Sequence, residues 1–280
     1  MGLLISRLER LEKPPRLYMS TRFPPYEFPY EALRAAAIQN IPDPIFVTVS
    51  GAHLYGFPSP DSDFDLRGAH RGGIEGVLGL FAPRETLEPK LFINDLEIEI
   101  VSHEIEKYLR LLMKPNGYVL EQIYSPHVVL STPAHEELKA LAQDTICRGL
   151  YHHYRGFLFS LQKLIAKEET KKVKRILYLY RVLMTGIHVL ETGVLEANIL
   201  KLNEHFKFEN IPELIHLKQL EWSELPEEKL NACWSEIESL EARLTHAHET
   251  STLPEKPSGL EELSRWLVNL RKAQMRGAGQ

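Results

Sequence analysis

Strand-like residues dominate the first half of this chain, and long helical periods dominate the second half. This separation predicts an α+β fold, in which a mixed sheet with flanking helices is followed by an all-helical C-terminal region. A chain of 280 residues, 44% of them hydrophobic, can build one large core or two modest ones. We therefore expect two domains, 1–135 and 136–280.

The first half contains four predicted strands. The run 44–50 is β-branched and apolar between a proline and a glycine, and 64–68 is a second strand. The runs 88–92 and 96–101 predict a hairpin that turns around 94–95.

Helical periods follow these strands. Ser102 is expected to cap a helix in which Ile105, Leu109 and Leu112 recur on one face. In the second half we expect helices over 151–166, 168–191, 211–221, 227–248 and 259–274.

Composition excludes several classes of protein. The 33 basic residues are outnumbered by 38 acidic ones, so no overall positive field favours non-specific binding of nucleic acid. Cys147 and Cys233 lie far apart without zinc-ligand spacing, so we expect neither a disulfide nor a zinc site. No apolar run approaches 18 residues, and charges interrupt the N-terminal segment, so we expect no membrane association and a cytoplasmic location.

Two aspartates, Asp63 and Asp65, are the clearest candidates for chemistry. On a strand, residues i and i+2 project to the same side, where two carboxylates repel each other unless a cation neutralises them. An Asp-x-Asp in a Ser- and Pro-rich loop is often only a solvated turn. A third carboxylate, Glu99 or Glu97, follows on another predicted strand and would complete a site for two Mg²⁺ or Mn²⁺ ions.

The turn after the first strand is the second half of this pattern. Ser50, Gly51 and Ala52 follow the strand directly and start a predicted helix. Backbone N–H groups at such a turn can bind a triphosphate without a side chain in the way.

These residues carry a resemblance to a known family. The segment 50–68, SGAHLYGFPSPDSDFDLRG, resembles the active-site signature of the DNA polymerase β nucleotidyltransferase superfamily. More narrowly, it is similar to a bacterial and archaeal branch of predicted nucleotidyltransferases, part of which is associated with RNA-repair gene clusters. The similarity continues through 98–102 and 114–121 and covers roughly residues 45–195.

The resemblance implies roles for the acidic residues. Asp63 and Asp65 would bind both metal ions and the nucleotide phosphates, and the third acid would bind the ion next to the attacking hydroxyl. Glu99 is preferred to Glu97 because the Val-Ser after it matches the helix start in related sequences. The family's Gly-Ser turn is Gly-Ala here, so Ser50 or Ser62 would have to supply the missing hydroxyl.

A basic helical face is the last candidate. Lys171, Lys174, Tyr178 and Arg181 fall at offsets of 0, 3, 7 and 10, which places them on one side of a helix. They would form a lid over the nucleotide phosphates, in agreement with a Lys-Lys then Tyr-x-x-Arg pattern in related sequences. The alternative is an ordinary solvated face.

Together these features predict a metal-dependent nucleotidyltransferase of the EC 2.7.7 type. It would transfer a nucleoside monophosphate from an NTP to an acceptor hydroxyl, preferably an RNA 3′ end, and release pyrophosphate. Transfer to a protein or small-molecule hydroxyl, or a non-catalytic nucleotide-binding or antitoxin-like module, are the alternatives. The sequence predicts neither the base of the NTP nor the oligomeric state.

Overall fold

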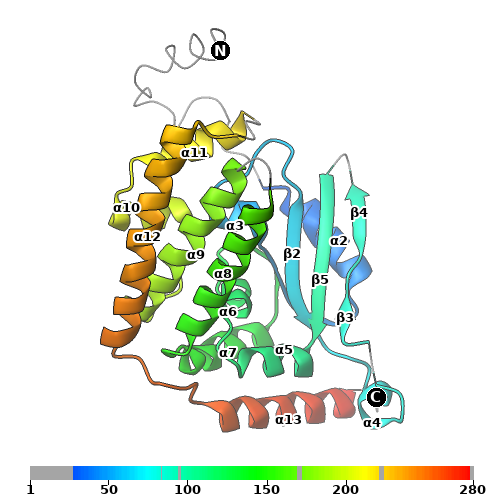
Figure 1. The fold of residues 1–280 in the computed structure, drawn as a ribbon. Helices are drawn as coiled ribbons and strands as arrows, with labels where there is room; N and C mark the ends of the chain where they lie inside the picture. The colour runs from blue at the N-terminus through cyan, green and yellow to red at the C-terminus, as the bar shows by residue number, and fades with distance from the viewer. Residues whose placement is uncertain (1–27, 83, 94–95, 169–171, 221–223, 278–280) are drawn as a thin grey trace.

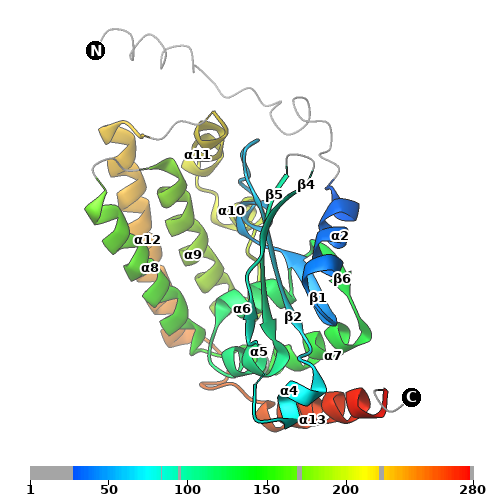
Figure 2. The ribbon, with the colours of Figure 1, turned by 90° about the vertical axis from the view of Figure 1, so that its right-hand side faces the viewer.

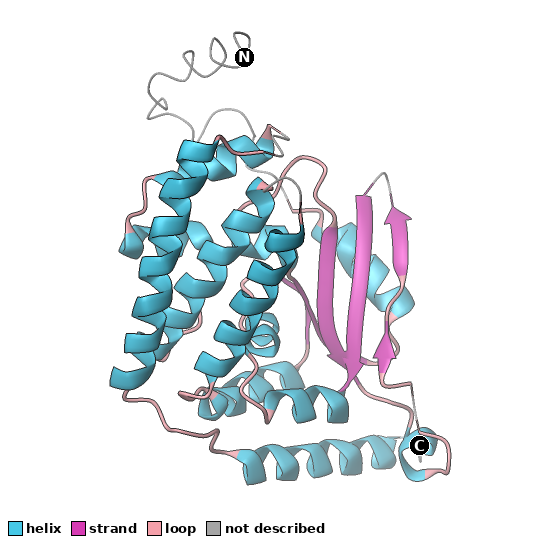
Figure 3. Ribbon diagram, viewed as in Figure 1, coloured by secondary structure: helices cyan, strands magenta, loops and turns pink. Residues whose placement is uncertain are grey.

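The computed structural model describes residues 28–277, apart from 83, 94–95, 169–171 and 221–223. A mixed sheet lies on one side of the molecule and a group of long helices on the other (Figures 1 and 3). The α+β class with a helical C-terminal region is confirmed. Within the described residues, no helix combines the length and the apolarity needed to cross a membrane.

The sheet has the strand order β3-β5-β2-β1-β6, and β4 also pairs with β5. Only β2 and β5 run parallel; the other described pairs are antiparallel. The strands are β1 (Pro44–Val49), β2 (Phe64–His70), β3 (Thr86–Leu87), β4 (Lys90–Ile93), β5 (Leu96–Glu104) and β6 (Val128–Ser131).

Helices cover both faces of the sheet (Figure 2). One face packs on α2 (Tyr30–Asn40) through a separate apolar cluster. The opposite face packs on α5 (Ile105–Leu112), α6 (Gly117–Ile123) and α7 (Pro133–Ala142). Two short helices, α3 (Gly51–Tyr55) and α4 (Ile74–Leu78), follow β1 and β2.

The second half is helical. Its elements are α8 (Leu150–Lys167), α9 (Val173–Thr192), α10 (Ile199–Phe206), α11 (Asn210–Gln219), α12 (Glu227–Thr250) and α13 (Leu260–Gly277). Helix α9 lies among α8, α10, α11 and α12, and α13 returns to pack on α4, α5 and α7. One buried apolar cluster extends from Ile45 to Leu263, so the two halves share a core. The division at 135 and 136 remains a prediction.

The end of β5 differs from the prediction. Strand β5 continues to Glu104, so Ser102 lies inside the strand and is not a helix cap. Its hydroxyl oxygen instead lies 2.9 Å from Nδ1 of His70 on β2. The cap of α5 is Glu104, whose carboxylate accepts a hydrogen bond from the Glu106 backbone N–H. The pairing partner supplied by β2 extends the strand, and single-sequence reasoning could not place that partner.

A buried ion pair joins the sheet side to the helical side. Arg181 of α9 donates to Glu121 of α6 at 2.7 Å, and both side chains are about 1% exposed. The Arg181 guanidinium lies 4.0 Å from the ring centroid of Tyr55, whose hydroxyl donates to Glu121 at 3.1 Å. The expectation that Arg181 faces a nucleotide is wrong, because its charge is already paired inside the core.

Candidate active site

Three carboxylates meet where β2 and β5 run side by side. The parallel register sets Asp65 directly beside Glu99, and Asp63 precedes β2 by one residue. One carboxylate oxygen from each of the three residues lies within 4.8 Å of the other two. Glu97 lies on the same face of β5 but forms an ion pair with Lys90 and is not part of this group. The structure thus places Glu99, not Glu97, with the two aspartates.

The turn after β1 is built around Asp65. Gly51 has a φ of +61°, and a Cβ added there would lie 1.9 Å from Asp65 Oδ2. The Ser50 backbone N–H also donates to the Asp65 carbonyl at 2.8 Å. Glycine is therefore required at position 51 for two reasons, its left-handed backbone and the close approach of the carboxylate.

Arg67 supplies a counter-charge to this acidic group. Its Nη2 donates to Asp65 Oδ1 at 2.6 Å and to Glu99 Oε1 at 3.3 Å, and its Nε donates to the Tyr118 hydroxyl at 2.8 Å. Burial raises the pKa of Asp65, Arg67 opposes that rise, and the charges of Asp63 and Glu99 add to it. One guanidinium thus holds two of the three acids together.

The acidic group fits a divalent cation. Its ligand atoms are all carboxylate oxygens, which Mg²⁺ and Mn²⁺ prefer, and they converge on one point. The side chains of Asp65 and Glu99 are partly exposed, at 21% and 41%, so an ion can reach them.

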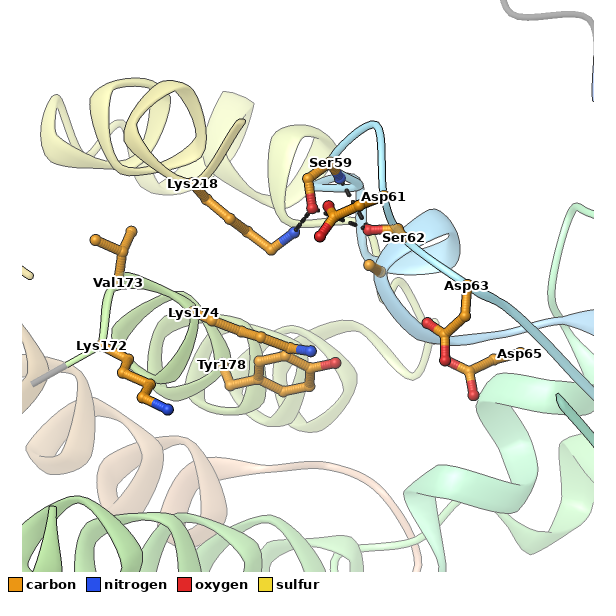
Figure 4. A pocket seen from close by; sticks show the side chains of 11 residues that line it. Ser59, Asp61, Ser62, Asp63, Asp65, Lys172, Val173, Lys174, Tyr178 and Lys218 are labelled. Atoms are coloured by element: carbon orange, nitrogen blue, oxygen red, sulfur yellow. Dashed lines mark hydrogen bonds between the residues drawn. The ribbon is translucent and has the colours of Figure 1, made fainter. Parts of the chain in front are cut away.

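A cavity of about 290 Å³ opens next to the aspartates (Figure 4). The loop before β2, the start of α9 and one residue of α11 form its walls. The lining residues are Ala52, Ser59, Asp61, Ser62, Asp63, Asp65, Lys172, Val173, Lys174, Tyr178 and Lys218. We call it the lysine-lined cavity.

Lys218 is a site residue that sequence reasoning missed. Its amine donates to Ser59 Oγ at 2.8 Å, and burial together with Lys174 lowers its pKa. A signal was present: Lys218 follows Ile211 and Leu214 at i+7 and i+4, so it lies on the buried face of α11. A lysine on an apolar face needs a polar partner, and here the partner is the loop before the aspartates.

The structure separates the residues predicted to bind a nucleotide. Lys174, Tyr178, Ala52 and Ser62 line the cavity, whereas Ser50 is buried. Burial raises the pKa of Tyr178 to about 12, so its hydroxyl remains a hydrogen-bond donor. Lys171 lies outside the described residues. Arg67 and Lys172, for which the sequence predicted no role, complete the charged surroundings.

Comparison with known proteins agrees with this arrangement. Residues 30–269 match RlaP, described as the RNA repair pathway DNA polymerase beta family. The chain belongs to this family. The resemblance carried by segment 50–68 is confirmed, and the family and the site indicate a polymerase-beta-like nucleotidyltransferase.

Individual relatives cover part of the chain. An uncharacterized protein of Methanocaldococcus jannaschii is 40% identical over 159 residues, which is 55% of this chain and 63% of that protein. The uncharacterized protein YcgL of Bacillus subtilis is 28% identical over 140 residues, 49% of this chain and 52% of that one. A crystal structure of a nucleotidyltransferase-like protein from Exiguobacterium sibiricum matches 80% of this chain and 75% of its own, at 13% identity and a TM-score of 0.32.

Replacing Gly51 with Ala should damage the acidic site. The added methyl group would displace the Asp65 carboxylate, so we expect Mn²⁺ affinity to fall at least about tenfold and the melting temperature to drop. Electron paramagnetic resonance titration of Mn²⁺ and thermal unfolding measure the two effects. The control is Gly156→Ala on α8, where an added Cβ meets nothing within 4 Å and should stabilise the helix slightly. Equal behaviour of the two variants would refute the account.

Replacing Arg67 with Met should lower the melting temperature of the metal-free protein and raise its affinity for Mn²⁺. Removing the guanidinium leaves Asp63, Asp65 and Glu99 to repel each other, so the metal-free protein should melt at a lower temperature. Mn²⁺ should bind roughly tenfold more tightly, because no positive charge competes for the same oxygens. The control is Arg71→Met, which removes an equal charge that pairs with Asp43. Weaker Mn²⁺ binding by Arg67→Met would contradict this interpretation.

Proposed function

We propose that this protein transfers a nucleoside monophosphate from an NTP to the 3′ hydroxyl of an RNA and releases pyrophosphate. The observation that supports this most is the convergence of Asp63, Asp65 and Glu99 beside the lysine-lined cavity. Three carboxylates next to the ammonium groups of Lys174 and Lys218 suit a substrate that brings both divalent cations and phosphates.

In this proposal the carboxylates hold the cations and so fix the substrate. A Mg²⁺ ion held by these carboxylates would supply positive charge for the reacting phosphate and would favour loss of the proton from the attacking hydroxyl. Asp63 and Asp65, which also line the cavity, would hold the cations that accompany the nucleotide. Glu99, which lies beside Asp65 on the neighbouring strand β5, would complete the cation site near the acceptor hydroxyl.

The lysine-lined cavity would hold the phosphates that leave. Lys174 and Lys218 present ammonium groups to it from two different helices, and Lys172 lies at its rim. Its volume of about 290 Å³ is near the lower end for ligand sites and suits the phosphate part of a nucleotide. The Tyr178 ring offers a flat surface or a hydroxyl donor at the same wall.

The choice of RNA as acceptor rests on the family's description as an RNA repair pathway family. A hydroxyl of a protein or a small molecule could also reach the exposed part of the acidic group and attack the NTP by the same chemistry. The assay therefore offers RNA together with cell extract, which contains protein and small-molecule hydroxyls.

The test is label transfer from each α-labelled NTP in Mg²⁺ or Mn²⁺, with tRNA, nicked RNA and cell extract as acceptors. We expect label on RNA, and a loss of at least about a hundredfold in Asp65→Asn, since a metal ligand supplies several kcal/mol of transition-state stabilisation. Asp43→Asn is the matched control, because that carboxylate pairs with Arg71 away from the site. Circular dichroism checks that both variants fold.

The outcomes separate the alternatives. Label on a protein band would replace RNA by a protein acceptor. NTP binding without any transfer would indicate a non-catalytic binding module and contradict the proposal. Transfer that persists in Asp65→Asn would show that the three carboxylates are not the catalytic group.

A further inference from the structure

The outer edge of the sheet carries two exposed side chains beside the acidic group. In the antiparallel pairing of β4 with β5, Lys90 lies opposite Glu99 and Phe92 lies opposite Glu97. Residues that pair directly across strands share a face of the sheet. Asp65, Glu99 and Lys90 therefore form one row across β2, β5 and β4, with about 10 Å between the backbones of the outer two.

The alternation along β4 fixes which side chains face outward. Leu91 and Ile93 pack into the apolar cluster that α2 covers. Lys90 and Phe92 point to the other face, the face of the acidic group, and Phe92 is 68% exposed. A single exposed aromatic residue is common on protein surfaces, so its position relative to Glu99 carries the argument, not its exposure.

The geometry of the proposed reaction predicts that the acceptor approaches over this face. Attack on a phosphate is in line, so the acceptor hydroxyl approaches from the side opposite the leaving group. In Figure 1, β2, β5 and β4 follow one another across the molecule on the side away from α9 and α11, the helices that carry the cavity's lysines. If the leaving phosphates occupy the lysine-lined cavity, the acceptor must arrive over β5 and β4.

The chemistry of this face favours one class of acceptor. An aromatic ring with a nearby lysine is the combination that binds single-stranded nucleic acid, by stacking a base and contacting one phosphate. Lys90 is held in place by Glu97, and this pair lies on the same face as the acidic group. The surrounding carboxylates repel the phosphates of an RNA. Stacking of a base on Phe92 would therefore supply most of the affinity.

We infer that Phe92 and Lys90 form the acceptor subsite, in which the ring stacks on a base at the 3′ end of a single-stranded RNA and the ammonium contacts its phosphate. This inference rests on the proposed function, because it assumes that nucleotide phosphates occupy the lysine-lined cavity. It defines the acceptor as an unpaired RNA end.

The test is fluorescence anisotropy with a short 5′-labelled RNA that ends in a 3′-deoxynucleotide, in Mg²⁺ and without NTP. Phe92→Ala should weaken binding about ten- to a hundredfold, and Phe92→Tyr should remain within about threefold of the wild type. Lys90→Met should lower the slope of log affinity against log salt by about 0.7, the value for one phosphate contact on a single strand.

Helix α8 provides a matched control. Phe159 is 56% exposed, and the Lys163 ammonium lies 4.3 Å from its ring centroid, so this pair has the same composition on a different surface. Phe159→Ala and Lys163→Met should leave RNA binding unchanged. Equal losses in both pairs would show non-specific surface binding and overturn the inference.

Label transfer separates this inference from the proposed function. If the wild type labels RNA and Phe92→Ala labels it with the same KM for RNA, the subsite is wrong while the transferase stands. If Phe92→Ala raises the KM for RNA and leaves the KM for NTP unchanged, both are supported. If the wild type labels only protein, or binds no RNA, the RNA acceptor and this subsite fail together.

Discussion

Repulsion among partly buried carboxylates is the constraint on which this site depends. Asp63, Asp65 and Glu99 share one small region, and the parallel pairing of β2 with β5 brings the last two side by side. The structure offsets this repulsion with one guanidinium, that of Arg67, which Tyr118 holds from α6. Arg67 therefore contacts carboxylate oxygens that a cation would also bind, so a cation would compete with its guanidinium.

The helical half is fixed relative to these acids by packing that starts at the same turn. Tyr178 of α9 packs edge-on against Tyr55 and Phe57, which follow the Gly51 turn, at centroid distances of 5.8 and 5.4 Å. The pair of Arg181 and Glu121 lies beneath them, fully buried. Breaking such a pair strands a charge in the core, so it disfavours movement of α9 away from the sheet. This packing places Lys172 and Lys174, at the start of α9, in the lining of the same cavity as the aspartates.

How much the sequence could predict depended on whether a feature was local. The strand before Gly51, the spacing of Asp63 and Asp65, and the long helices all follow from short-range patterns, and the structure contains them. The helices α2, α7 and α10 went unpredicted because their apolar residues mark one face less clearly than those of α5, and the strand β6 went unpredicted because it has only four residues. The length of β5 depends on its partner strands, which the sequence does not identify. The sequence therefore predicts Ser102 as the cap of α5, whereas Glu104 is the cap.

The site shows the same limit at the level of single side chains. Helical spacing grouped Arg181 with Lys174 and Tyr178, but it could not show that Glu121, sixty positions away, would take the Arg181 charge. Lys218 reaches the cavity through its hydrogen bond to Ser59, 159 positions away in the chain. The residue pattern around Asp63 cannot predict that contact. Arg67 was within reach of sequence reasoning, since it lies at i+2 from Asp65 on the same strand face.

The central claim is that Asp63, Asp65 and Glu99 act together as one divalent-cation site. The most direct measurement is a crystal structure with Mn²⁺ and a non-hydrolysable NTP, in which anomalous scattering locates the manganese. The account predicts manganese bound to Asp63 and Asp65, with Glu99 as a ligand to at least one ion and the phosphates extending toward Lys174 and Lys218. Manganese bound elsewhere, or a nucleotide that leaves these three carboxylates without an ion, would contradict it.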